Sequence, residues 1–125
     1  DGKWLVFLDD RLCMDPDAVE AFVNALEAQP GSWVWGVKDD APKGFVENFS
    51  AIERRAMVTC GMFNERIEWY GATTRDVELR LKALGCEFHR VEQAKAYELR
   101  KSSRWYNRKD DVVKSKFLMF KLYGI

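Results

Sequence analysis

The apolar positions of this chain follow two patterns, continuous runs of strand length and stripes at helical spacing. The run WLVFL at residues 4–8 predicts a strand covered on both faces, and SWVWGV at residues 32–37 predicts a second strand. Between them, DPDAVEAFVNALEAQPG predicts a helix whose apolar residues recur every three or four positions. Asp15 is its expected N-cap, with Pro16 at the first helical position. Together the three elements predict a βαβ-like unit.

The rest of the chain continues this alternation of helices and strands. FVENFSAIERRAMVTCG predicts a short extended piece and a short helix that a glycine ends. TTRDVELRLKALG predicts a clear helix, with Thr73 and Asp76 spaced as a capping box. CEFHRV and AKAYEL predict two short strands, and the tail predicts a third helix with Val113, Phe117 and Phe120 on one side. The predicted class is α/β, with a sheet that is incomplete at its N-terminal edge.

The length, charge and cysteine content of the chain limit its domain organisation, its partners and its cellular setting. The 125 residues suit one domain, with a body at about residues 1–99 and a basic helical tail at about residues 100–125. The net charge is zero, so we expect no nucleic-acid partner. The tail nevertheless carries eight Lys and Arg against two Asp and Glu. The three cysteines are widely spaced, which predicts neither a disulfide framework nor a zinc site and favours a cytoplasmic setting.

Two acidic residues, Asp9 and Asp10, follow the first predicted strand, and Arg11 stands directly after them. In open α/β sheets, ligands bind beyond the carboxyl ends of the strands. Carboxylate oxygens there suit Mg²⁺ or Mn²⁺ that bridges to phosphates. Simple capping of a loop explains these two residues equally well.

The stretch DGKWLVFLDDRLCMDPDAVEAFV resembles the metal-binding stretch of the family 2 glycosyltransferases, inverting nucleotide-sugar enzymes with a GT-A fold. NFSAIERRAMVTCGMFNERIEWYGATTRDVELRLKALGCEFHRVEQAKAYEL is similar to the acceptor-side half of that family. There a small-residue turn, a GGFDE-like segment and an ED before a helix follow in this order. The corresponding residues here are Asn48–Ser50, Gly61–Glu65 and Arg75–Asp76.

The resemblance covers about residues 1–99 and implies a GT-A-like mixed sheet flanked by helices. It also implies that the family's N-terminal, nucleotide-binding half is absent from this chain. Because Asp1 stands directly before a buried-type strand, we expect a segment that precedes it.

The same resemblance implies inverting transfer of a sugar from a nucleoside-diphosphate donor, such as a UDP-sugar, to a hydroxyl of a carbohydrate or other acceptor. Asp9 and Asp10 take the place of the family's DxD-type motif, one facing the ribose and one facing a Mn²⁺ or Mg²⁺ ion on the pyrophosphate. Asp76 takes the place of the general base that removes the acceptor's proton. Glu98 stands near the position of a metal-binding histidine and offers an oxygen ligand instead.

Two alignments of the acidic motif remain open. In a three-acid form the last acid falls on Arg11 and the metal ligand is lost; in a two-acid form Asp10 is the ligand and Arg11 is incidental. Arg75 likewise stands where the family usually has a glutamate. Because a guanidinium can hold a pyrophosphate bidentately, Arg11 either replaces the charge of a cation or marks a relative that has lost catalysis.

Two aromatic residues, the basic tail and the first strand predict further binding surfaces. Trp69 and Tyr70 lie just before Asp76, the expected base, and predict, with Arg75, an acceptor-binding surface. The basic tail predicts either peripheral contact with an anionic membrane surface or a solvated face on a helix that packs against the body. The unpaired apolar edge of the strand at residues 4–8 predicts that the chain either forms oligomers or is held by a segment outside it.

Other functions stay open beside the transferase. One is a non-catalytic nucleotide-sugar-binding relative or a truncated interaction domain. Another is an α/β phosphatase-like fold with Asp9 as its nucleophile, although no matching Lys, Ser or Thr motif is obvious after the other predicted strands.

Overall fold

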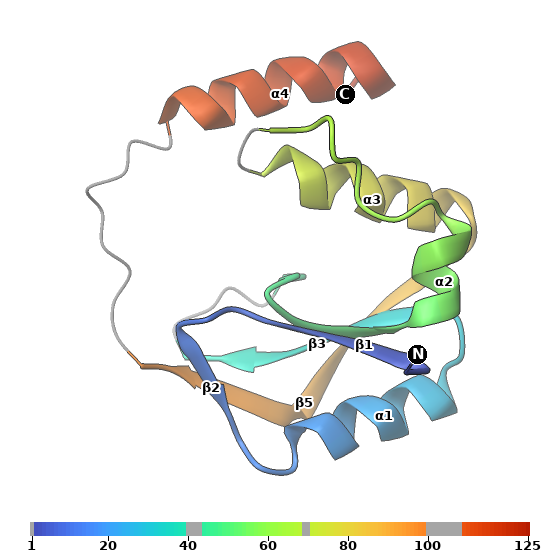
Figure 1. The fold of residues 1–125 in the computed structure, drawn as a ribbon, viewed down its shortest axis with the longest axis vertical. Helices are drawn as coiled ribbons and strands as arrows, with labels where there is room; N and C mark the ends of the chain where they lie inside the picture. Colours follow the sequence, from blue (N-terminus) through green and yellow to red (C-terminus); the bar gives the residue numbers. More distant parts are fainter. Residues whose placement is uncertain (1, 40–43, 69–70, 100–108) are drawn as a thin grey trace.

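The computed structural model describes residues 2–39, 44–68, 71–99 and 109–125 of the chain. Its elements, in chain order, are β1 (Trp4–Leu8), β2 (Leu12–Met14), α1 (Ala18–Ala28), β3 (Ser32–Lys38), β4 (Phe49–Glu53), α2 (Arg54–Thr59), α3 (Ala72–Ala83), β5 (Glu87–Glu98) and α4 (Lys109–Tyr123). They form a mixed α/β fold in which helices flank one sheet (Figure 1). Among the helices of these residues, none has the length and apolar character that a membrane span requires.

The strands of the described residues form a single mixed sheet in the order β1-β4-β3-β5-β2. β4 pairs antiparallel with both β1 and β3, β3 pairs in parallel with β5, and β2 pairs antiparallel with β5. β1, β3 and β5 therefore run in the same direction. For the predicted βαβ-like unit, the common direction of β1 and β3 is confirmed. The two strands are not neighbours, because β4 lies between them.

Helices cover the two faces of the sheet unequally (Figure 1). On one face, Phe22 and Leu26 of α1 belong to a buried apolar cluster with the central strands. On the other face, α2 and α3 cover a second cluster in which Val77 of α3 packs with Trp33 of β3. α4 lies against the side of α3 that faces away from the sheet, where Met119 is buried. The burial of these apolar side chains holds the layers together.

The edge strand β1 differs from the prediction of a strand covered on both faces. Leu5 and Phe7 pack against the cluster under α3, whereas Val6 and Leu8 are 36% and 41% exposed. The physical reason is that α1 packs over β3, β4 and β5, which leaves the outer strand uncovered on that face. The expected unpaired edge is confirmed within the described residues, because β1 is the last strand on its side of the sheet.

Two predicted helix starts are wrong in detail. α1 begins after Asp17, because the Asp15 N–H donates to the Lys95 carbonyl (2.8 Å) and its carbonyl accepts the Ala18 N–H (3.0 Å) in a turn. α3 begins after Gly71, whose φ of +90° suits a glycine. The expected capping box is not formed, because the Thr73 hydroxyl donates to the carbonyl of Ile67, 3.4 Å away.

The last two elements also refine the prediction. β5 is one continuous strand where two were expected, and its register against β3 shifts between Trp35 and Val37. The tail helix is confirmed as α4, but its predicted apolar side points away from the body. Val113, Phe117 and Phe120 are 67%, 61% and 64% exposed.

Candidate functional site

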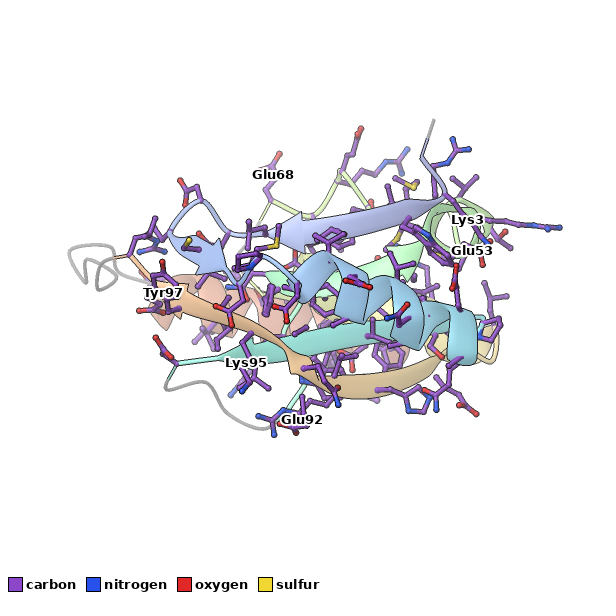
Figure 2. The ribbon with its side chains drawn as sticks, turned by 90° about the horizontal axis from the view of Figure 1, so that it is seen from below. Lys3, Glu53, Glu68, Glu92, Lys95 and Tyr97 are labelled. Atoms are coloured by element: carbon purple, nitrogen blue, oxygen red, sulfur yellow. The ribbon has the colours of Figure 1, made fainter. Side chains whose placement is uncertain are left out.

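Polar side chains gather at the end of the sheet where the three same-direction strands finish. Figure 2 shows Lys3 and Glu53 at the opposite end of the molecule from Tyr97 of β5, which marks these carboxyl ends. Asp9, Asp10 and Arg11 follow β1 directly, and Lys38 is the last residue of β3. Because β4 runs the other way, the residues before it, Glu47 and Asn48, reach the same end. We call Asp9, Arg11, Lys38, Glu47 and Asn48 the strand-end cluster.

The Asp9 carboxylate is held by its own turn and by the loop before β4. Its Oδ1 accepts the Arg11 backbone N–H (3.1 Å), and the Arg11 Nε lies 3.9 Å from the same oxygen. Its Oδ2 accepts the side-chain amide of Asn48 (3.4 Å), whose oxygen in turn accepts the Lys38 Nζ (2.9 Å). These bonds join three strand ends and leave the Asp9 side chain 27% exposed.

Two opposing effects set the pKa of Asp9. Burial raises it, but the hydrogen bonds and the nearby guanidinium of Arg11 outweigh burial, so the pKa lies below its ordinary value. The carboxylate is therefore ionised at neutral pH. An ionised, partly exposed carboxylate can accept hydrogen bonds from the hydroxyl groups of a ligand.

Glu47 is a member of the cluster that the sequence prediction missed. Its carbonyl accepts the Ser50 hydroxyl (2.6 Å), which accepts the indole N–H of Trp33 (3.0 Å), so its backbone is anchored in the core. Its carboxylate lies 3.5 Å from the Thr74 hydroxyl of α3. Burial and the negative charge of Asp9 raise the pKa of Glu47. The available signal was the stretch FVENFS, which places a carboxylate and an amide just before a buried strand.

Asp76, the predicted general base, lies in a different environment. It is 3% exposed, and its Oδ2 accepts both the Nε (3.1 Å) and an Nη (2.8 Å) of Arg80. Its Oδ1 accepts the hydroxyl of Tyr123 from α4. Arg80 also donates to the carbonyls of Cys60 (2.6 Å) and Met62 (2.7 Å). Asp76 therefore ties α3 to α4 and, through Arg80, to the segment after α2.

A surface cavity of about 740 Å³ adjoins this ion pair. It is lined by residues 61–66 together with Asp76, Arg80, Leu122 and Tyr123. The lining of this cavity places the segment Gly61–Glu65 next to Asp76. Burial lowers the pKa of Arg80, but the Asp76 carboxylate more than compensates, so the guanidinium stays charged.

The strand-end cluster and Asp76 lie on different sides of α3. Thr74 faces Glu47, whereas Asp76 faces Arg80 and Tyr123. Successive residues of an α-helix are about 100° apart around its axis, so Thr74 and Asp76, two positions apart, are separated by about 200°. Their side chains therefore point in nearly opposite directions. The predicted donor residues and the predicted base therefore belong to separate contact networks among the described residues.

The predicted acceptor residues are only partly placed. Arg75 forms an exposed ion pair with Glu78 (3.3 Å) and lines a cavity of about 500 Å³ between α3 and α4. Trp69 and Tyr70 lie outside the described residues. Near the sheet, the indole N–H of Trp35 is buried and has no hydrogen-bond partner within the described part of the chain.

The predicted metal ligands, Asp10 and Glu98, are both exposed. They lie at the same sheet end, because Glu98 pairs in register with Leu12 and the Leu99 N–H donates to the Arg11 carbonyl (2.9 Å). Asp9 is already engaged, and in the described ranges no group of three His, Cys, Asp or Glu side chains could hold a metal. These residues do not fit a divalent cation bound by protein ligands alone.

The comparisons with known proteins do not name a family. No protein-family model matches the chain, and no curated protein gives a significant match. The likeness to family 2 glycosyltransferases therefore stays a prediction from the residues.

Proposed function

We propose that this chain is the acceptor-side part of a GT-A-like glycosyltransferase that binds a nucleoside-diphosphate sugar at the strand-end cluster. The observation that carries the proposal is the meeting of Asp9, Arg11, Lys38, Glu47 and Asn48 at the carboxyl ends of parallel strands. Open α/β sheets bind their ligands at this position. The loosely matched family motifs support it independently.

The cluster contains both kinds of group that such a donor needs. The carboxylates of Asp9 and Glu47 suit ribose or sugar hydroxyls, and the cations of Arg11 and Lys38 suit a diphosphate. In inverting transfer, a carboxylate takes the acceptor's hydroxyl proton while that oxygen bonds to the anomeric carbon. The bond from this carbon to the diphosphate oxygen breaks, and the leaving diphosphate keeps the electron pair. Arg11 would stabilise the charge that develops there.

Asp76 is kept as the proposed base because of the loosely matched motif Arg75–Asp76, but its direction away from the strand-end cluster counts against this role. For this role, the Tyr123 hydroxyl would have to leave Oδ1 so that an acceptor hydroxyl could take its place. The proposed setting is the cytoplasm, which the three unpaired cysteines favour. A divalent cation brought in with the diphosphate would add ligands from outside the chain, and we derive no step from it.

A second candidate is a relative that binds a nucleotide sugar without transferring it. The specific observation in its favour is that both oxygens of Asp76 are occupied by protein donors and the side chain is buried. A carboxylate held in this way serves the fold and has no oxygen free for an acceptor.

Calorimetric titration with UDP, with and without Mn²⁺, tests the donor site. We expect Arg11→Ala to weaken UDP binding about tenfold, the effect of losing one charge-assisted contact. Arg55→Ala is the matched control, because Arg55 is an exposed arginine at the opposite end of the sheet. Binding of Mn²⁺ alone should be weak because of the nearby guanidinium. If UDP does not bind, or binds equally well to the Arg11→Ala variant, the donor-site proposal is wrong.

A transfer assay with the intact protein separates the two candidates. In the transferase, Asp76→Asn lowers the rate by about 10²–10⁴-fold while UDP binding stays within about twofold. UDP binding without any transfer by the unmodified protein supports the binding relative instead. An unchanged rate in Asp76→Asn removes Asp76 from the mechanism.

A further inference from the structure

The outer side of α4 carries a row of large apolar side chains that the described part of the chain leaves exposed. Val113, Phe117 and Phe120 are 67%, 61% and 64% exposed. Their spacing of four and three residues places them on one side of the helix. We call these three residues the apolar ridge. Such a row is costly to leave in water, and exposed apolar patches of this kind mark interaction sites.

The opposite side of α4 fixes the direction in which the ridge points. Ser115 and Met119 are 7% and 6% exposed, and Met119 packs with Ile67 and Ala72. The Tyr123 hydroxyl donates to Asp76 of α3. Because these contacts hold the inner side of α4 against α3, the exposed apolar ridge faces away from the body. Figure 1 shows α4 as the outermost helix beyond α3.

Lysines border the ridge on its two sides. At about 100° per residue, Lys114 and Lys121 fall on one side of the ridge and Lys116 on the other. The Lys121 Nζ lies 5.0 Å from the centre of the Phe117 ring, so the two side chains are close together. From Val112 to Ile125 the sequence contains three lysines and no acidic residue. The charged residues beside Phe117 and Phe120 are therefore all positive, whereas Asp110 lies one turn before Val113.

We propose that α4 binds an anionic lipid bilayer, with the apolar ridge in the acyl boundary and the lysines at the lipid phosphates. This surface is separate from the strand-end cluster and does not depend on the proposed transferase function. An apolar stripe flanked by lysines is the arrangement of helices that lie in a membrane interface, because the lysine stems reach back to the headgroups. A protein partner fits less well, since protein interfaces are poor in lysine and enriched in arginine, and residues 112–125 contain no arginine.

Sedimentation of the 125-residue chain with lipid vesicles tests the proposal. Vesicles of phosphatidylcholine with phosphatidylserine should bind the chain, and vesicles of phosphatidylcholine alone should bind it far less. The double variant Phe117→Ser/Phe120→Ser should lose at least about tenfold in partition coefficient, because two apolar side chains no longer enter the acyl boundary. Val58→Ser on α2 is the matched control, since Val58 is also an apolar helix residue and is 58% exposed.

The lysines provide a second, independent readout. Lys114→Gln or Lys121→Gln should each weaken binding to the anionic vesicles about fivefold, and added salt should weaken binding of the unmodified chain. Lys114, Phe117, Phe120 and Lys121 are all exposed, so circular dichroism should show an unchanged fold for each variant. Equal binding by the Phe117→Ser/Phe120→Ser variant, or no binding to anionic vesicles, overturns the proposal. The chain could instead self-associate without binding vesicles, and the double variant could abolish that self-association. This result would assign the ridge to contact with a second copy of the chain and would also overturn the proposal.

Discussion

Asp9 and Asp76 both occupy motif positions in the sequence, but their surroundings in the fold are opposite. Asp76 is 3% exposed, and Arg80 and Tyr123 occupy its two oxygens. The Asp9 side chain is 27% exposed, and its partners are the backbone of its own turn and one side-chain amide. The bonds of both residues connect separate elements of the fold, but only those of Asp9 leave the carboxylate accessible, at a sheet end.

This difference separates a carboxylate that the fold needs from one that a ligand can reach. A buried charge that loses its partner keeps its full desolvation cost, so removing the partner lowers the free energy of unfolding strongly. A partly exposed carboxylate can exchange a protein donor for water or for a ligand at little cost. The comparison therefore predicts large stability effects around Asp76 and small ones around Asp9 and Glu47.

The largest effect is expected for Arg80→Ala. The substitution leaves the Asp76 carboxylate buried without its cation and removes the donor from the carbonyls of Cys60 and Met62. We expect the free energy of unfolding to fall by about 3 kcal/mol, within the range for breaking a largely buried ion pair. Urea denaturation of the variant and the unmodified chain measures this difference.

Arg75→Ala is the matched control for that experiment. Arg75 lies on the same helix and also forms an ion pair, but its side chain is 46% exposed, so the cost should stay below about 0.5 kcal/mol. Equal losses for the two variants would show that burial does not distinguish the Asp76 pair.

Much of the fold follows from local patterns in the sequence. The strand at WLVFL, the second strand at SWVWGV and the helices at α1, α3 and α4 were all predicted from apolar spacing. The pattern does not contain the position of β4 between β1 and β3, because pairing order depends on contacts between residues far apart in the chain. Which side of α4 is buried could not be predicted, for the same reason. Its sequence has apolar residues on two sides, and only α3 decides which side is buried.

The candidate site was predictable only where its residues directly follow a strand. Asp9, Asp10 and Arg11 stand next to the first apolar run, so the strand-end rule identified them. Lys38 also directly follows a predicted strand but was not singled out, whereas Glu47 joins the cluster through the antiparallel placement of β4, which local spacing does not reveal. Asp76 was assigned from a loose motif. Its bonds to Arg80 four residues later and to Tyr123 in another helix are features that no motif includes.

A smaller effect is expected for Asp9→Asn. The pKa of Asp9 is lowered in the fold, so its ionised form contributes stability above the unfolded pKa, and this contribution is lost as the pH falls through the folded pKa. At pH 7 we expect the variant to be about 1 kcal/mol less stable than the unmodified chain. The difference should shrink below about pH 4. Urea denaturation across this range measures it, and a difference that does not change with pH would mean that the charge of Asp9 is unimportant.

The smallest effect, and the most informative one, is expected for Glu47→Gln. The pKa of Glu47 is raised by burial and by Asp9, so the ionised side chain opposes folding at neutral pH. The stabilising contribution of the protonated form is present below the unfolded pKa and is lost as the pH rises through the folded pKa. Glutamine keeps an oxygen for the Thr74 hydroxyl and removes the charge, so the variant should be more stable at pH 7 by about 0.5 kcal/mol. Below about pH 4 the two proteins should be equally stable.

If Glu47 binds the donor, the same variant should bind UDP more weakly, so that stability rises while binding falls. Arg80→Ala should instead lower stability without acting at the donor site. A Glu47→Gln variant that is less stable at pH 7 would place Glu47 with Asp76, among the carboxylates that the fold itself requires.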